Sequence, residues 1–147
     1  MVEATASKPA RVLVCRLSAG EDILNSIAEV ARRHDVKAAY FMLIGAIRKA
    51  RLGYFDVHGK QYTEIHIERD LEVASCTGNI ARLEDGEVIV HAHAVVADGL
   101  GSCTGGHVLQ GCEVSVTAEL FMTELQDPLV RTRDEVTGLN LLDLKRR

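Results

Sequence analysis

The sequence contains no tryptophan and few aromatic residues of any kind, which make up 4% of its 147 residues. This scarcity argues against binding of single-stranded nucleic acid, which relies on bases stacking on exposed aromatic rings. The formal net charge is −4, so the chain also lacks the basic surplus with which duplex-binding domains neutralise phosphates. The composition therefore disfavours nucleic acid as a partner, and the core must be built from aliphatic side chains.

Long hydrophobic runs are absent as well. No apolar stretch approaches the roughly 20 residues that a membrane-spanning helix needs, and residues 1–9 lack the apolar segment of a secretory signal. The four cysteines, Cys15, Cys76, Cys103 and Cys112, form no C-x-x-C pair, so they are expected to be reduced thiols. We therefore expect one domain, located in the cytoplasm and without membrane association.

The hydrophobic pattern predicts one helix. From Ile23 to Ala31, apolar residues recur at positions i, i+1, i+4, i+7 and i+8, which places them on one stripe of a helix over residues 22–34. The preceding Ser18-Ala19-Gly20-Glu21 has the S-x-x-E form of a capping box.

The rest of the chain is rich in strand patterns, with Gly45 as an expected bulge and residues 98–106 as a glycine-rich loop. The expected strands cover residues 11–17, 38–47, 50–56, 62–68, 71–82, 87–97 and 112–125. One helix beside mostly sequential strands predicts the α+β class, a mostly antiparallel or mixed β-sheet packed against one main helix. We divide the chain into an N-terminal arm (1–10), the domain (11–126) and a C-terminal tail (127–147), in which residues 134–144 could form a short helix or a further strand.

Three of the six histidines lie close together, in His91-Ala92-His93 and in Gly105-Gly106-His107. Side chains alternate along a strand, so His91 and His93 point to the same side, with Cα atoms roughly 6.5–7 Å apart. Two glycines before His107 allow the backbone to approach closely or to adopt a positive φ. The three imidazoles are thus a candidate metal site, although histidines in strands are often ordinary hydrogen-bonded residues.

Three imidazole ligands leave one coordination position open, which is typical of catalytic or ligand-binding zinc sites and not of closed structural ones. Imidazole also binds copper, nickel and iron, so the ligands alone do not select the metal.

Further candidates are Asn79, Glu72 and Cys103. Asn79 could orient a ligand histidine or a bound group, or simply cap a strand end. Glu72 could act as a general base for metal-bound water, or be an ordinary surface residue of a strand. Cys103 could be a fourth ligand or a redox thiol, but no basic neighbour in the sequence would lower its pKa.

These motifs in this order resemble the plants-and-prokaryotes-conserved (PPC) domain family, over about residues 11–125. The motifs are Gly20-x-Asp22, Gly45-Ala46-Ile47, Leu52-Gly53-Tyr54, Gly78-Asn79-Ile80, Asp85-Gly86, His91-x-His93, Gly105-Gly106-His107-x-x-x-Gly111 and Thr117-x-Glu119. The resemblance implies a compact sheet-and-helix domain that assembles as a homotrimer. It also implies that the histidines cluster and hold a metal, with zinc as the best candidate.

Members of this family are also labelled DNA-binding, and plant members carry a basic Arg-Gly-Arg-Pro element that this sequence lacks. We therefore expect a regulatory domain, or one that binds a small-molecule ligand, with a three-histidine zinc site. The alternatives are a DNA-binding protein, as the family label suggests, and a metal-dependent hydrolase or lyase. The sequence leaves the catalytic residues unknown and does not decide whether the protein is an enzyme.

Overall fold

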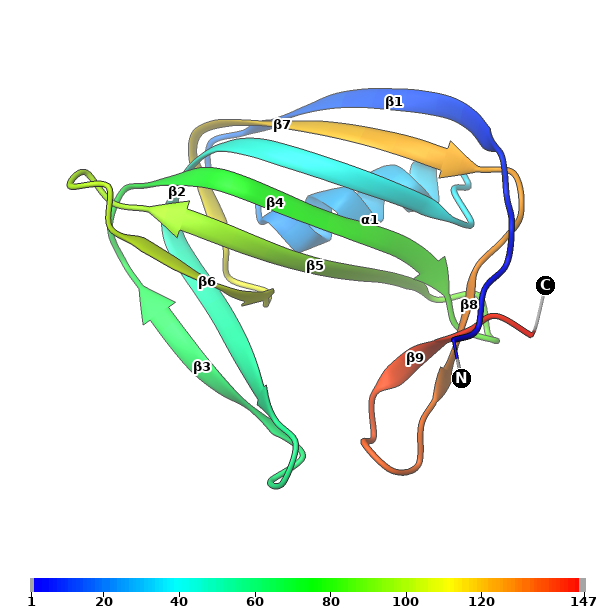
Figure 1. Ribbon diagram of the computed structural model, residues 1–147. Coiled ribbons are helices and arrows are strands. Elements are labelled where there is room, and N and C mark those ends of the chain that lie inside the picture. Colours follow the sequence, from blue (N-terminus) through cyan, green and yellow to red (C-terminus); the bar gives the residue numbers. More distant parts are fainter. Residues whose placement is uncertain (1, 146–147) are drawn as a thin grey trace.

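A computed structural model describes residues 2–145 of the chain. In this range the chain forms one helix, α1 (Ile23–Arg33), and a nine-stranded sheet (Figure 1). The strands are β1 (Pro9–Ser18), β2 (Ala39–Asp56), β3 (Gln61–Ile67), β4 (Leu71–Arg82), β5 (Val88–Ala97), β6 (Cys103–Val108), β7 (Glu113–Leu125), β8 (Val130–Arg133) and β9 (Asn140–Asp143). The predicted α+β class, a mostly antiparallel or mixed sheet with one main helix, is confirmed.

The sheet is organised around the long strand β2. Its first half pairs with β7 and β4 and its second half with β6 and β3, so the sheet curls around this strand. Within residues 2–145 the strands pair antiparallel, except for a single parallel bridge between β4 and β8. Neighbouring strands follow the order β1-β7-β2-β6-β5-β4-β8-β9, with β3 beside β2.

Gly45 marks the bend within β2. Its φ is +145°, and the pairing register shifts on both sides of it. A Cβ at this position would lie 2.4 Å from the carbonyl oxygen of Thr117, so only glycine lets β2 and β7 approach this closely. The expected bulge is confirmed. The two expected strands are, however, one 18-residue strand, because Lys49 pairs with Glu113 after a register shift at residue 48.

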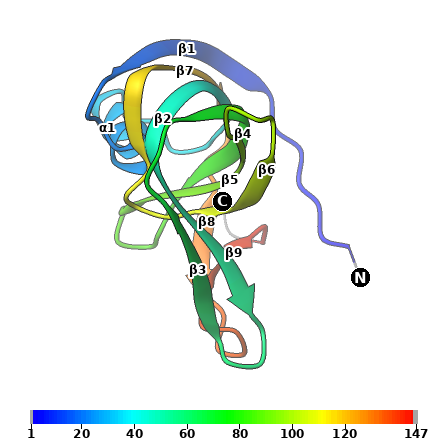
Figure 2. The ribbon, with the colours of Figure 1, turned by 90° about the vertical axis from the view of Figure 1, so that its left-hand side faces the viewer.

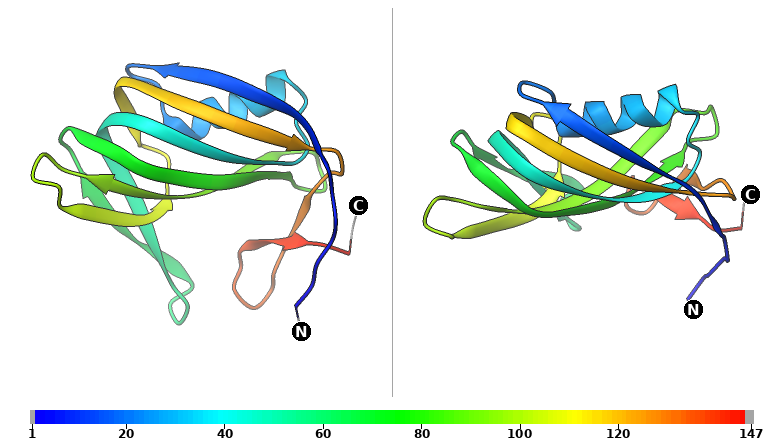
Figure 3. Two further views of the ribbon diagram at one scale, coloured as in Figure 1. Left: turned by 45° about the horizontal axis from the view of Figure 1, so that its top comes forward. Right: turned by 90° about the horizontal axis from the view of Figure 1, so that it is seen from above.

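Helix α1 packs one apolar stripe against one face of the sheet (Figure 3). Asp22 caps its start by accepting a hydrogen bond from the Asn25 N–H, while Glu21 accepts one from the Ser18 N–H at 2.6 Å. The helix buries Ile23, Ile27, Ala28 and Ala31. The small residues Ala92 and Ala94 of β5 are buried on the helix side of the sheet, and so the alternation of β5 turns its histidines to the opposite side.

The chain after residue 127 adds a β8–β9 hairpin to the sheet. This hairpin and the β2–β3 hairpin project in the same direction from the sheet, and two perpendicular views show this (Figures 1 and 2). Within the tail, residues 140–143 are a strand, the second of the two predicted options.

Strand β1 begins at Pro9, within the predicted arm. Strands β6 and β8 were not predicted, and β6 begins at Cys103, within the predicted loop. Within residues 2–145 no helix is long and apolar enough to cross a membrane.

Candidate metal centre

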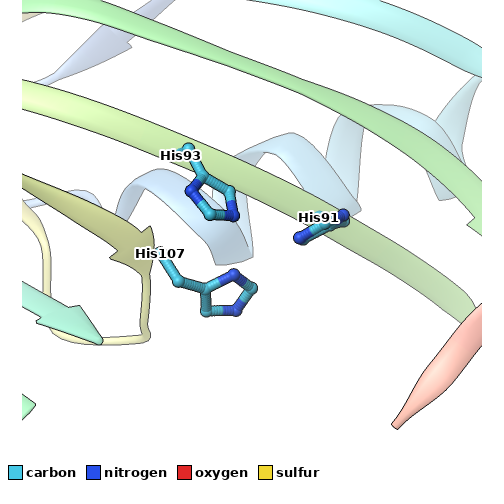
Figure 4. A group of neighbouring side chains, drawn as sticks. All are labelled: His91, His93 and His107. Atoms are coloured by element: carbon cyan, nitrogen blue, oxygen red, sulfur yellow. The ribbon is translucent and has the colours of Figure 1, made fainter. Parts of the chain in front are cut away.

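His91, His93 and His107 come together on the sheet face opposite α1 (Figure 4). His93 on β5 stands directly opposite His107 on β6, and His91 lies two residues earlier on β5. The ring centroids are 5.2 Å apart for His91–His93, 5.1 Å for His91–His107 and 5.3 Å for His93–His107. One nitrogen from each ring lies within 4.8 Å of the others, and the three rings turn toward a common space. This spacing suits a single metal ion, since zinc–nitrogen bonds are about 2.0–2.1 Å long.

Glycines bring β6 close enough for His107 to join the group. A Cβ on Gly105 would lie 3.0 Å from the Ala94 carbonyl oxygen, and a Cβ on Gly106 would lie 2.9 Å from that of Gly53. Close approach, one of the two roles expected for the glycine pair, is what the structure shows. Neither glycine has a positive φ.

Each of the two hairpins brings one side chain into contact with a histidine. Tyr62 of β3 stacks on the His107 ring, with centroids 4.9 Å apart and planes at 23°. Arg131 of β8 brings its Nη2 to 3.4 Å from Nδ1 of His91. These two contacts come from segments outside β5 and β6, the strands that carry the histidines.

Burial favours the neutral form of two of these imidazoles, His107 and His91. It lowers the pKa of His107 to about 4, with smaller contributions from His91, His93 and Arg131. Burial also lowers the pKa of His91, helped by the charge of Arg131. Neutral imidazole is the form that binds metal. In addition, Nδ1 of His107 is buried without a hydrogen-bond partner among the described residues, an unusual state that a metal bond would satisfy. The donor set therefore fits a transition metal.

An open groove of about 780 Å³ runs from the histidines along the same face of the sheet. Its polar end is lined by His91, His93, Thr77 and Asn79, and its apolar wall by Tyr40, Met42 and Phe121. The strand register explains this composition: Phe121, Met42, Thr77, His93 and His107 stand opposite one another on five neighbouring strands.

The other sequence-predicted candidates lie at different places. Asn79 pairs with His91 across β4 and β5, and its Oδ1 accepts a hydrogen bond from Arg131 at 2.8 Å. Glu72 lies in a separate hollow beside Arg48 and Asp98. Cys103 pairs with Ala97 at the far end of β6 and is exposed. Among the described residues, neither Glu72 nor Cys103 belongs to the histidine group.

Sequence reasoning missed Tyr62 and Arg131 as neighbours of the histidines. Both come from hairpins whose sequence positions are far from residues 91–107, and neither lies in a motif. Alternation along residues 61–67 shows which face of its strand carries Tyr62. It does not show that this face meets His107, because that contact depends on the curl of β2.

Comparison with known proteins places this geometry in context. The chain is 30% identical over 130 residues to the bifunctional protein GlmU of Synechococcus sp. (strain JA-3-3Ab), which covers 87% of this chain. The chain spans only about a fifth of the length of that relative (20%), so the relative's activities do not follow from the match.

Solved structures resemble the chain over nearly all its length. A metal-containing protein from Archaeoglobus fulgidus superposes with a TM-score of 0.88 at 29% identity, covering 97% of this chain and 99% of that one. A plant- and prokaryote-conserved (PPC) protein from Pyrococcus horikoshii gives 0.89 at 28%, covering 97% of each chain. A protein from Ralstonia eutropha JMP134, named as a candidate DNA-binding protein, gives 0.81 at 31%, covering 89% and 90%.

The family profile of the Plants and Prokaryotes Conserved (PCC) domain matches residues 4–126. This range includes the complete histidine group and ends before the β8–β9 hairpin. The protein therefore belongs to the Plants and Prokaryotes Conserved domain family, as its motifs indicated.

Proposed function

We propose that this protein is a regulatory or ligand-binding domain that holds a zinc ion through His91, His93 and His107. The observation that supports this most is the convergence of three imidazole nitrogens within 4.8 Å of one another. The unpartnered Nδ1 of His107 adds to it. The metal-containing protein from Archaeoglobus fulgidus, with the same fold, points in the same direction.

Three imidazoles and an adjoining groove suit a site that binds a small molecule at an open coordination position. Zinc is the first candidate because imidazole nitrogen and tetrahedral geometry suit it, although copper or nickel would accept the same ligands. When bound, the metal would supply a Lewis-acid centre. The chain's own residues orient the rings and form the walls of the groove.

Zinc titration of chelator-stripped protein tests this function. We expect about one zinc ion per chain for the wild type, and loss of tight binding for His93→Ala. His58→Ala is the matched control because His58 is exposed in the turn between β2 and β3. Equal zinc affinity for wild type and His93→Ala would contradict the proposal, and weakened binding by His58→Ala would show that the assay measures adventitious surface histidines.

We further propose that the protein assembles as a homotrimer, as the family resemblance implies. In the single chain, the face formed by β1, β7 and β2 exposes large apolar side chains: Val14 is 66% exposed, Met42 52% and Phe121 41%. Exposed apolar patches of this kind usually mark protein interfaces. This face continues into the groove, so a neighbouring copy would lie beside the histidines. Light scattering should give three times the chain mass of 16.1 kDa, and Val14→Lys should reduce it.

DNA binding, suggested by the Ralstonia relative's name, remains the alternative. Many basic side chains are already paired with carboxylates, as in Arg11–Glu124, Arg51–Glu64 and Arg69–Asp98. Phosphates would have to compete with these pairs. Duplex binding whose affinity falls steeply with salt would favour this alternative.

A metal-dependent hydrolase or lyase is the other alternative, and turnover of a small ester or similar substrate that disappears with the metal would favour it. We also expect the protein to reside in the cytoplasm, where its thiols would remain reduced.

A further inference from the structure

The C-terminal hairpin places a buried arginine beside the histidine group. Arg131 is only 6% exposed. Its Nη1 donates to the Asn140 carbonyl oxygen at 2.7 Å and its Nη2 to Asn79 Oδ1 at 2.8 Å. Residue 131 lies beyond the stretch matched by the family profile, which ends at residue 126.

The charge of Arg131 is not compensated within the described part of the chain. Both acceptors are neutral amide oxygens, and no described carboxylate forms an ion pair with it, in contrast to exposed residues such as Arg48 and Arg51. Its Nε is buried and has no hydrogen-bond partner among the described residues. Arginine is almost never this buried unless it is paired, because removing the charge from water is costly. An anion at this position would compensate the charge and satisfy Nε.

Metal binding would remove the acceptor that His91 offers to Nη2 of Arg131. Guanidinium only donates hydrogen bonds, so the contact between Nη2 and His91 Nδ1 at 3.4 Å requires a lone pair on Nδ1. The guanidinium occupies the Nδ1 side of the ring, which leaves Nε2 to bind a metal. A neutral imidazole bound through Nε2 carries its hydrogen on Nδ1. Arg131 then loses this acceptor and needs another.

We propose that Arg131 recognises the anionic group of the ligand, a carboxylate or phosphate of a small molecule that enters the groove at Asn79 and His91. Guanidinium presents parallel N–H donors, whose geometry matches two oxygens of a carboxylate or phosphate. Nε and Nη2 form such a pair, of which Nη2 contacts Asn79 and His91, two residues that line the groove. This inference rests on the proposed function, because the ligand is expected at the open position of the metal.

Phosphate titration of the cobalt-loaded protein, followed by visible absorption of the cobalt, tests the inference. Arg131→Lys keeps the positive charge but removes the pair of parallel N–H donors. We expect it to bind one cobalt ion like the wild type and to bind inorganic phosphate about tenfold more weakly, or worse. Azide binds the metal and does not need the paired N–H donors of arginine. Its affinities for the wild type and for Arg131→Lys should therefore agree within about twofold. Arg133→Met is the matched control, since Arg133 lies on the same hairpin and is exposed.

Asn79→Asp provides a second variant that keeps Arg131 intact. The new carboxylate would stand in place of the Asn79 amide oxygen, which is 2.8 Å from Nη2. It would neutralise the charge of Arg131 without a bound anion. We expect the metal-free variant to melt at a higher temperature than the wild type, and phosphate binding to weaken by about tenfold or more.

The outcomes separate the two claims. Failure of the wild type to bind cobalt would overturn the proposed function and this inference with it. Full cobalt loading without phosphate binding by the wild type, or with equal phosphate affinity for wild type and Arg131→Lys, would overturn this inference alone.

Discussion

Gly106→Ala should weaken metal binding although Gly106 has no side chain that could bind the metal. A Cβ here would lie 2.9 Å from the Gly53 carbonyl oxygen and 3.4 Å from Leu52 Cβ. Carbon–oxygen contacts are normally at least 3.3 Å, so β6 must move away from β2 by about 0.4 Å. The two strands pair only at Leu52–Val108 and Gly53–His107. The shift therefore displaces His107, and metal–ligand distances tolerate only about 0.2 Å.

We expect Gly106→Ala to lose about 10- to 100-fold in zinc affinity and about 1–3 kcal/mol of stability from overpacking. Competition with a chromophoric chelator measures the first quantity and urea denaturation of metal-free protein the second. Gly99→Ala is the control, because a Cβ at Gly99 meets no atom within 4 Å. Unchanged zinc affinity in Gly106→Ala would refute the argument that strand spacing positions His107.

Three further predictions concern the protein without metal. Stability should fall as the pH drops from about 6.5 toward 4, because burial lowers the folded-state pKa of His107 to about 4 and the unfolded chain takes up the proton first; urea midpoints across this range measure it. An alkylating reagent should modify exposed Cys103 in the native protein and Cys76, whose pKa burial raises to about 12, only after unfolding, as peptide mass spectrometry would show. Ile27→Ala should cost about 2–5 kcal/mol in urea denaturation, because Ile27 is 0% exposed; a loss below about 1 kcal/mol would show that the α1 contact is not part of the core.

Local patterns predicted the parts of this structure that depend on neighbouring residues. The apolar stripe from Ile23 to Ala31 gave the helix, and strict alternation placed His91 and His93 on one face of β5. The single Gly45 signalled a bulge that the structure shows. In each case the determining contacts lie within a few residues or follow from the period of the element.

The remaining features depend on contacts between distant segments. The pairing of His107 with His93 follows from the β5–β6 register, and the approach of Tyr62 follows from the curl of β2. Arg131 lies on β8, which the sequence did not predict, since only residues 134–144 were expected to form a helix or a strand. Its environment is set by Asn79, 52 positions earlier, and such long-range pairing leaves no periodic trace in the sequence.

Zinc content of gently purified protein, measured by elemental analysis beside the His91→Ala/His93→Ala double variant, tests the central claim most directly. Light scattering and circular dichroism of the same samples establish the mass of the assembly and the integrity of the fold. We expect close to one zinc ion per chain in the wild type and none in the folded variant. Absence of any transition metal from both proteins, even after incubation with zinc, would contradict the three-histidine site.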